Sequence, residues 1–271
     1  MGRFEYDLSW PHRLCALILG LLEMSHAYNS KFMDYASVSS RHAARRVTAL
    51  LQSQIEIASV LDVGCAHGTW LRTWRESGIA DIRGLDGEYV DIDRLDIPRA
   101  DFTAADLNRP FELGRRYDLV QSLEVGEHVR SEASGNFINS IAQHAEKYVL
   151  FSAAPPGQGG EFHINEQPFD FWRRRFSDHG FAVFDWLRPQ IAGDVKISFW
   201  YRFNMFLYVR HEHVSSLPAS LRATMVPDGT RLRDISPPSF RVRKAVIRKL
   251  PYRVQHEIAR LKARVLPTGR F

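Results

Sequence analysis

The order of hydrophobic and polar positions along the middle of the chain predicts strands that alternate with helices. Short apolar runs bounded by turn residues predict strands over 59–63, 82–85, 101–104, 117–123, 148–152, 181–186 and 199–210. Apolar positions at helical spacing predict helices over 39–52, 67–77, 131–146 and 167–179. This alternation is typical of an α/β domain whose mostly parallel, seven-stranded sheet carries helices on both faces.

Composition and charge divide the chain of 271 residues into three parts. Residues 1–27 form an N-terminal helical appendage, 28–210 the α/β domain, and 211–271 a basic extension. The apolar run 14–22 is shorter than the roughly 20 residues that span a bilayer, and two acidic residues before it dilute the positive charge that a signal peptide requires. We therefore interpret this run as a buried or docking helix and expect a cytoplasmic protein.

The basic character of the protein comes from its C-terminal extension. Residues 239–271 hold ten Lys or Arg and one Glu, a net charge of +9, whereas the whole chain has +5. Apolar residues at helical spacing predict a final amphipathic helix through Val254, Ile258, Leu261 and Val265. Three interpretations stay open: a helix docked on its own domain, contact with an anionic membrane surface that makes the protein peripheral, and contact with nucleic acid, which we disfavour.

Cysteine usage indicates a reducing compartment. The two cysteines, Cys15 and Cys65, are too few for a disulfide framework. Cys65 lies in a glycine-containing turn, where a small residue that fills a tight space is favoured over a functional thiol. No Cys and His residues have the spacing of a structural zinc site.

The segment 60–71 carries the strongest functional signal in the chain. It combines a short apolar strand, a turn of small residues and the start of a helix, and its glycines allow backbone to approach a bound nucleoside closely. Asp86 ends the next predicted strand about 20 residues later, where an open α/β sheet places a carboxylate against ribose hydroxyls. Asp106 follows the third predicted strand. Helix capping or turn formation is the alternative role of both acids.

These pieces, in this order, resemble the class I S-adenosylmethionine-dependent methyltransferases. The resemblance runs from about residue 28 to 210 and rests on VLDVGCAHGTWL, GLDGEYV, AADLNRPF, YDLVQSLEVGEHV and YVLFSAAPPGQGG. The last two segments and FHINEQPFDFW resemble a bacterial subgroup that acts on small molecules or glycans. The chain departs from the family at Ala66, where the family usually has glycine. The resemblance implies a Rossmann-like fold with an antiparallel last strand, S-adenosylmethionine as cofactor and S-adenosylhomocysteine as product.

The resemblance also implies which residues hold the cofactor. Asp62 would orient its amino group or an ordered water, Asp86 its ribose and Asp106 its adenine amino group. Leu107 would offer its backbone N–H to the ring. The full set of implied cofactor residues is Asp62, Gly64, Cys65, Ala66, His67, Gly68, Asp86, Gly87, Asp106, Leu107 and Glu124.

Methyl transfer to a hydroxyl benefits from a general base, and histidine is suited to that role near neutral pH. His163 lies in the loop after the fifth predicted strand, and Glu166 is placed to hold it in one tautomer. His128 follows the fourth strand and is the second candidate. Tyr201 and Asn204 belong to an aromatic–Asn cluster that faces either the substrate or the core. Glu127, His128, His163 and Asp194 are candidates for a divalent-cation site, as the resemblance to some sugar methyltransferases implies. Because they are scattered along the chain, this has little weight and we predict no metal site.

The sequence therefore predicts an O-methyltransferase acting on a small molecule, sugar or glycan precursor. Methylation of exocyclic amines on nucleic-acid bases is disfavoured, because residues 123–126 read Leu-Glu-Val-Gly where such enzymes have Asp or Asn, two prolines and an aromatic residue. Two alternatives remain: an RNA-modifying methyltransferase that uses the basic extension, and a non-catalytic scaffold that binds S-adenosylmethionine. The motifs predict no oligomeric state.

Overall fold

The computed structural model describes residues 30–251 together with 254 and 257. The N-terminal appendage predicted over 1–27 lies outside these residues. Of the predicted C-terminal amphipathic helix, the positions Ile258, Leu261 and Val265 also lie outside them. Among the described residues, no helix is long and apolar enough to cross a membrane.

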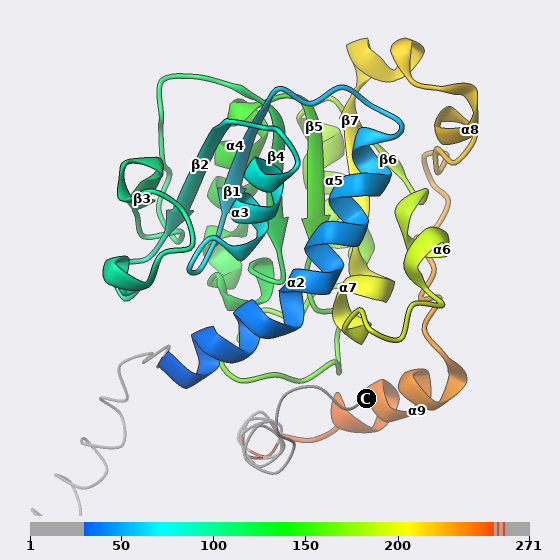
Figure 1. The fold of residues 1–271 in the computed structure, drawn as a ribbon. Coiled ribbons are helices and arrows are strands. Elements are labelled where there is room, and N and C mark those ends of the chain that lie inside the picture. Colours follow the sequence, from blue (N-terminus) through cyan, green and yellow to red (C-terminus); the bar gives the residue numbers. More distant parts are fainter. Residues whose placement is uncertain (1–29, 252–253, 255–256, 258–271) are drawn as a thin grey trace, which may run out of the picture.

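A seven-stranded sheet forms the centre of the molecule, with strand order β3-β2-β1-β4-β5-β7-β6 (Figure 1). Its strands are β1 (Ser59–Val63), β2 (Asp81–Asp86), β3 (Phe102–Ala104), β4 (Tyr117–Leu123), β5 (Ala145–Ser152), β6 (Phe181–Phe184) and β7 (Phe206–Arg210). The first five strands pair in parallel, and β7 runs antiparallel to both β5 and β6. The predicted fold, including its antiparallel last strand, is therefore confirmed. The carboxyl ends of the parallel strands meet at the lower edge of the sheet in Figure 1.

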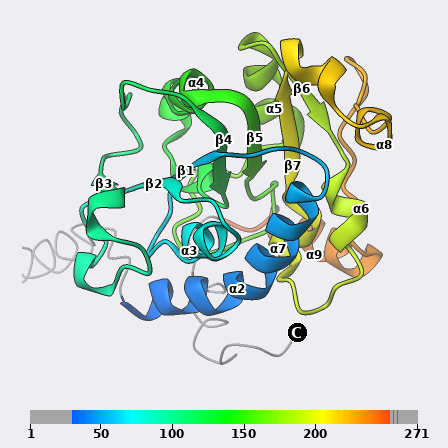
Figure 2. The same ribbon diagram turned by 45° about the horizontal axis from the view of Figure 1, so that its top comes forward.

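Helices cover both faces of this sheet, as the two views show (Figures 1 and 2). One face packs against α2 (Ser30–Gln52), α3 (Thr69–Glu76), α6 (Leu187–Ile191) and α7 (Phe199–Asn204), and the other against α4 (Ser134–His144) and α5 (Phe169–Asp178). The alternation along β5 shows why the sheet has two apolar faces: Tyr148 and Leu150 enter the first core, and Val149 and Phe151 the second.

The strand predicted over 199–210 is wrong in its first half, which forms α7, whereas β7 begins only at Phe206. Phe199 and Phe203 are one helical turn apart, and both rings contact Phe240, at centroid distances of 5.0 and 6.4 Å. The aromatic run has a high strand propensity, but this packing requires a helix, and tertiary contacts decide the outcome.

Two further boundaries differ from the sequence prediction. The helix predicted over 131–146 ends at His144, because Ala145 already pairs with Tyr117 of β4. The helix that precedes β1 begins earlier than predicted, at Ser30 instead of residue 39. Short 3-10 turns complete the described chain at Ile92–Arg94, Arg99–Asp101, Gly126–His128, Ser131–Ala133 and His211–Ser216.

The C-terminal extension contributes α8 (Ala219–Arg222) and α9 (Pro238–Ile247) to the described structure. α9 lies against the loop that follows β5, so closely that a Cβ atom at Gly157 would lie 2.1 Å from the carbonyl oxygen of Lys244. The ammonium group of Lys244 is paired with Asp234 at 2.5 Å. This part of the extension is thus docked on its own domain. A membrane surface or nucleic acid as the partner of its basic residues stays a prediction.

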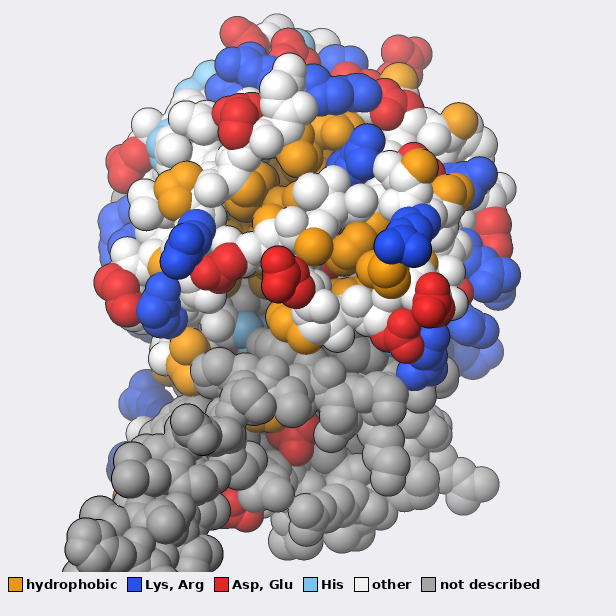
Figure 3. Space-filling view, turned by 90° about the vertical axis from the view of Figure 1, so that its left-hand side faces the viewer, with side chains coloured by type: hydrophobic (Ala, Val, Ile, Leu, Met, Phe, Trp, Pro, Cys, Tyr) orange, Lys and Arg blue, Asp and Glu red, His pale blue; other side chains and the backbone are white. Residues whose placement is uncertain are grey.

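The surface on the β3 side shows no separation of charge. Figure 3 shows Lys and Arg side chains intermingled with Asp and Glu side chains around a group of hydrophobic ones. The part of this face that the structure describes therefore carries charges of both signs, unlike the single-sign surface that favours a polyanionic partner.

Candidate functional site

The turn between β1 and α3 is shaped by three residues with positive φ. These are Gly64 at 85°, Ala66 at 51° and Gly68 at 86°. A Cβ atom at Gly64 would lie 2.3 Å from the Val125 side chain, so no larger residue fits there. Ala66 adopts the left-handed conformation in place of the usual glycine, which the small alanine side chain permits at some cost. The turn leads directly into the first turn of α3.

Asp86, at the end of β2, ties this turn to the neighbouring strand. Its Oδ2 accepts from the backbone N–H of Ala66 at 2.7 Å, and its Oδ1 accepts from the N–H of Gly87 at 2.7 Å and from the hydroxyl of Tyr89. Burial raises the pKa of Asp86, and these hydrogen bonds oppose the rise. Asp86 therefore makes the turn contacts of the alternative prediction, and its role toward a ribose stays a prediction.

Asp62 is a buried carboxyl near the end of β1, in register with Gln121 of β4 and Gly84 of β2. Burial raises its pKa from 3.8 to about 7. The Gln121 side chain lowers it in part, and the charge of Asp86 adds to the rise. This carboxyl is poised to lose a proton when a cationic group comes close.

The remaining predicted cofactor residues differ in their surroundings. Asp106 is about half exposed and accepts from the backbone and side-chain N–H groups of Asn108, both at 3.0 Å, which lowers its pKa. Its turn lies next to β2, because the N–H of Ala105 donates to the carbonyl of Asp86 at 2.7 Å. Leu107 is partly buried beside this turn.

Cys65 and His67 are both buried within the turn after β1. The sulfur of Cys65 lies so close to Gly84 that a Cβ atom there would be 2.7 Å away, and burial raises the pKa of the thiol well above its usual value. This agrees with the interpretation of Cys65 as a space-filling residue. The carbonyl of His67 accepts from the N–H of Asp96 at 2.7 Å, which holds the turn against the following loop.

A cluster of polar side chains lies beyond β4, and part of it was missed at the sequence level. Glu124, with φ of 58°, accepts from Gln158 at 2.9 Å and from Asn204 at 3.2 Å. The amide of Asn204 also donates to Gln158 at 2.8 Å. Gln158 lies in a Gly- and Pro-containing loop without periodicity, so no sequence signal marked it. Burial raises the pKa of Glu124.

The structure brings His163 and Glu166 together as the sequence suggested. His163 Nδ1 lies 2.9 Å from Glu166 Oε1. The two oxygens of Glu166 also accept from the backbone N–H groups of Gly157 at 2.7 Å and Gly159 at 2.6 Å. Glu166 is thus fixed at three points and holds the imidazole in one orientation.

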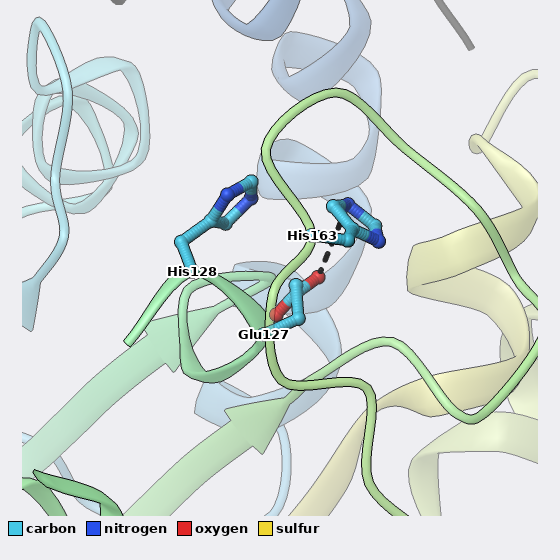
Figure 4. A group of neighbouring side chains, drawn as sticks. All are labelled: Glu127, His128 and His163. Carbon is cyan, nitrogen blue, oxygen red and sulfur yellow. Dashed lines mark ion pairs between the residues drawn. The ribbon is translucent and has the colours of Figure 1, made fainter. Parts of the chain in front are cut away.

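His128 and Glu127 approach His163 from the other side, in the 3-10 turn after β4 (Figure 4). The rings of His128 and His163 meet edge to face with centroids 4.9 Å apart, and His128 Nδ1 lies 3.2 Å from the carbonyl oxygen of Phe162. Glu127 is fully buried, with Oε1 3.9 Å from His163 Nε2. Burial raises the pKa of Glu127 well above its usual value. Asp194 is not part of this cluster but pairs with His42 at 2.8 Å.

Comparison with known proteins identifies one family model and several similar solved structures. A family model described as "Methyltransferase domain" matches residues 35–187. Similar solved structures include magnesium protoporphyrin IX methyltransferase from Synechocystis PCC 6803 (20% identity, 64% of this chain and 84% of that chain, TM-score 0.48) and DesVI from Streptomyces venezuelae (19%, 76% and 100%, TM-score 0.49). A third is CalS10, an amino pentose methyltransferase from Micromonospora echinaspora (15%, 78% and 100%, TM-score 0.40). Among the curated proteins, none matches this chain.

Proposed function

This chain belongs to the methyltransferase domain family, and on that premise we propose that it methylates a hydroxyl group of a small molecule, sugar or glycan precursor. Its cofactor is S-adenosylmethionine, which leaves as S-adenosylhomocysteine. The family model covers α3, the strands from β1 to β6 and the loop that carries His163, so both halves of the site belong to the matched region.

The cofactor side of the site is built from the ends of β1 and β2. The glycine turn lets backbone lie against the nucleoside, and Asp86 accepts from the ribose hydroxyls where it now accepts from the Tyr89 hydroxyl. Asp62 faces the amino group of the methionine moiety, whose positive charge favours the ionised carboxylate. Asp106 and Leu107 border the adenine.

The acceptor side carries the chemistry. The acceptor oxygen attacks the methyl carbon, the carbon–sulfur bond breaks, and its electron pair stays on the neutral sulfur of S-adenosylhomocysteine. The hydroxyl proton passes to Nε2 of His163. Alignment of oxygen, methyl and sulfur supplies most of the acceleration, and proton transfer adds about 10²–10⁴-fold.

The observation that carries this proposal is the contact between His163 and Glu166. A carboxylate on Nδ1 keeps the ring proton there and leaves Nε2 with a lone pair. It also stabilises the imidazolium that forms when the acceptor proton arrives. The same arrangement offers nothing to a scaffold that only binds the cofactor.

His163→Gln is expected to lower kcat about 100-fold or more without changing the affinity for S-adenosylmethionine. His211→Gln, in an exposed turn after β7, is the matched control and should change neither quantity. Cofactor affinity is measured by titration calorimetry, and turnover by methyl transfer to a panel of sugars and small alcohols. A wild-type protein that does not bind S-adenosylmethionine would contradict the proposal.

Asp86→Asn is expected to weaken cofactor binding about tenfold or more, because the amide offers the ribose hydroxyls a poorer acceptor than a carboxylate does. The variant retains an acceptor oxygen for the N–H of Ala66, which limits its effect on the turn. Titration calorimetry of the wild type and of Asp86→Asn with S-adenosylmethionine measures the ratio of their dissociation constants. Equal affinities would assign Asp86 to turn formation alone.

A further inference from the structure

Glu127 is a buried carboxyl group that no side-chain donor compensates. Its exposed fraction is 0%, no side chain in the described part of the chain donates a hydrogen bond to its oxygens, and the nearby backbone N–H groups of Glu127 and Ala154 offset its burial only in part. No lysine or arginine in the described part of the chain forms an ion pair with it, and Glu124 and Glu166 are close enough for their negative charges to act on it. A buried carboxylate in such a position is costly unless a cation compensates it.

Two imidazoles share this space with the carboxylate. One ligand atom from each of Glu127, His128 and His163 lies within 4.8 Å of the other two, and Figure 4 shows the carboxylate pointing toward the His163 ring, with the His128 ring on the same side. Bonds of about 2.1 Å to a tetrahedral ion would separate the ligand atoms by roughly 3.4 Å. Small side-chain rotations therefore suffice to close the set around an ion.

The surrounding contacts hold these ligands in place. Glu166 orients His163 through a hydrogen bond at Nδ1, which leaves Nε2 to face an ion. Such carboxylate–histidine pairs position imidazole ligands in metal sites. The carbonyl of Glu127 accepts from the N–H groups of Ile164 and Asn165, each at 2.9 Å, which ties the turn after β4 to the His163 loop. A Cβ at Gly126 would lie 3.0 Å from Trp172, so the turn that presents Glu127 packs tightly on α5.

From the buried carboxyl group, which no side-chain donor or cation compensates, and from this geometry, we infer that Glu127, His128 and His163 bind a divalent transition-metal ion. Two nitrogen ligands and one carboxylate favour zinc, cobalt or iron over magnesium, which prefers oxygen ligands throughout. Three protein ligands leave coordination positions for water or for the acceptor oxygen. This inference departs from the prediction of no metal site, which gave these residues little weight because they are separated in the sequence.

Only the role of the ion rests on the proposed function. A bound ion would take the lone pair of His163 Nε2, so the ion would replace this histidine as the group that activates the acceptor: it would lower the pKa of a coordinated hydroxyl, and water would take the proton. Ion binding itself requires neither the cofactor nor an acceptor. The two inferences are therefore testable separately.

The test is titration of the purified, chelator-treated full-length protein with Co²⁺, followed by the visible absorption of the bound ion. We expect one equivalent to bind and Glu127→Gln to weaken binding about 100-fold or more. Glu132→Gln changes an exposed glutamate five residues away and should leave the affinity unchanged. His163→Gln serves as a second variant, and S-adenosylmethionine affinity reports whether each variant is folded.

Wild-type protein that binds no Co²⁺, or binding that survives Glu127→Gln, overturns the inference and leaves Glu127 as a buried neutral acid. Mg²⁺ that binds as tightly as Co²⁺ contradicts a nitrogen-containing site. If the protein binds the cofactor but not Co²⁺, the metal site is rejected and the proposed methyltransferase function stands. If it binds Co²⁺ but not the cofactor, the metal site stands and the proposed function is rejected.

Discussion

Asp62→Asn is expected to stabilise the protein without cofactor at pH 8 while weakening its affinity for S-adenosylmethionine about tenfold. Burial raises the pKa of Asp62 from 3.8 to about 7, so an ionised carboxylate at pH 8 is held in a place that disfavours it. At about 1.36 kcal/mol per pKa unit, the cost reaches about 4 kcal/mol. Asparagine is neutral and avoids this cost.

The pH dependence has a definite sign. Because the folded protein binds this proton more tightly than the unfolded chain does, the free energy of unfolding falls as pH rises from about 4 to about 7, and is constant above that range. The advantage of Asp62→Asn should therefore be near zero at pH 4 and full at pH 8. Below pH 7, the affinity of the wild type for the cofactor should increase as pH rises, by up to tenfold per pH unit. The reason is that the cationic amino group favours the ionised carboxylate.

Denaturant unfolding across this pH range, paired with calorimetry at each pH, measures both effects. Asp93→Asn replaces an exposed carboxylate in the turn after β2 and is the matched control, for which we expect no change in either quantity. If the difference in free energy of unfolding between Asp62→Asn and the wild type does not change from pH 4 to 8, burial does not raise the pKa of Asp62.

Arg188→Ala is expected to lower the free energy of unfolding by about 3–5 kcal/mol. The guanidinium is fully buried and donates to both oxygens of Asp185, at 2.7 and 2.6 Å. It also donates to the carbonyl of Phe203 at 3.0 Å and of Arg233 at 2.9 Å, and it lies 3.9 Å from the centre of the Phe206 ring. Alanine leaves Asp185 and two carbonyl groups without their donor, and leaves a cavity between α6 and β7.

Thermal unfolding should register this loss as a fall in Tm of about 10 °C. Arg174→Ala, on the exposed side of α5, removes the same side chain from solvent-exposed surroundings and should shift Tm by less than about 2 °C. Arg188→Lys restores the charge but not the fork of donors, so an intermediate Tm is expected. Equal Tm values for Arg188→Ala and Arg174→Ala would refute a structural role for Arg188.

The sequence was most informative where apolar residues gather in a short run bounded by a turn. Strand β4 was predicted with its observed bounds, because the apolar residues Tyr117, Leu119, Val120 and Leu123 extend through it and a turn follows Leu123. The prediction of a strand at the position of α7 was wrong because aromatic residues occur in both strands and helices. Packing against Phe240, far along the chain, favours the helix.

At the candidate site, the sequence revealed residues that lie at a fixed spacing, but not contacts between residues that are far apart in the sequence. The glycine turn and Asp86 were found because a fixed spacing links them. The proximity of His163 to Glu127 depends on how the loop after β5 returns to the turn after β4, and nothing local encodes that return. The burial of Glu127 was equally hidden, since an acid beside a histidine is ordinarily a surface pair.

The contact between α9 and the loop after β5 bears on where the chain can be cut. A fragment that ends at Arg210, after the last strand, would lose the backbone that lies against Gly157, and with it one wall of the segment whose N–H groups fix Glu166. It would also lose Arg233, whose carbonyl meets Arg188. A minimal expression fragment, or a fusion that places a partner after the sheet, should therefore keep the chain through at least Ile247.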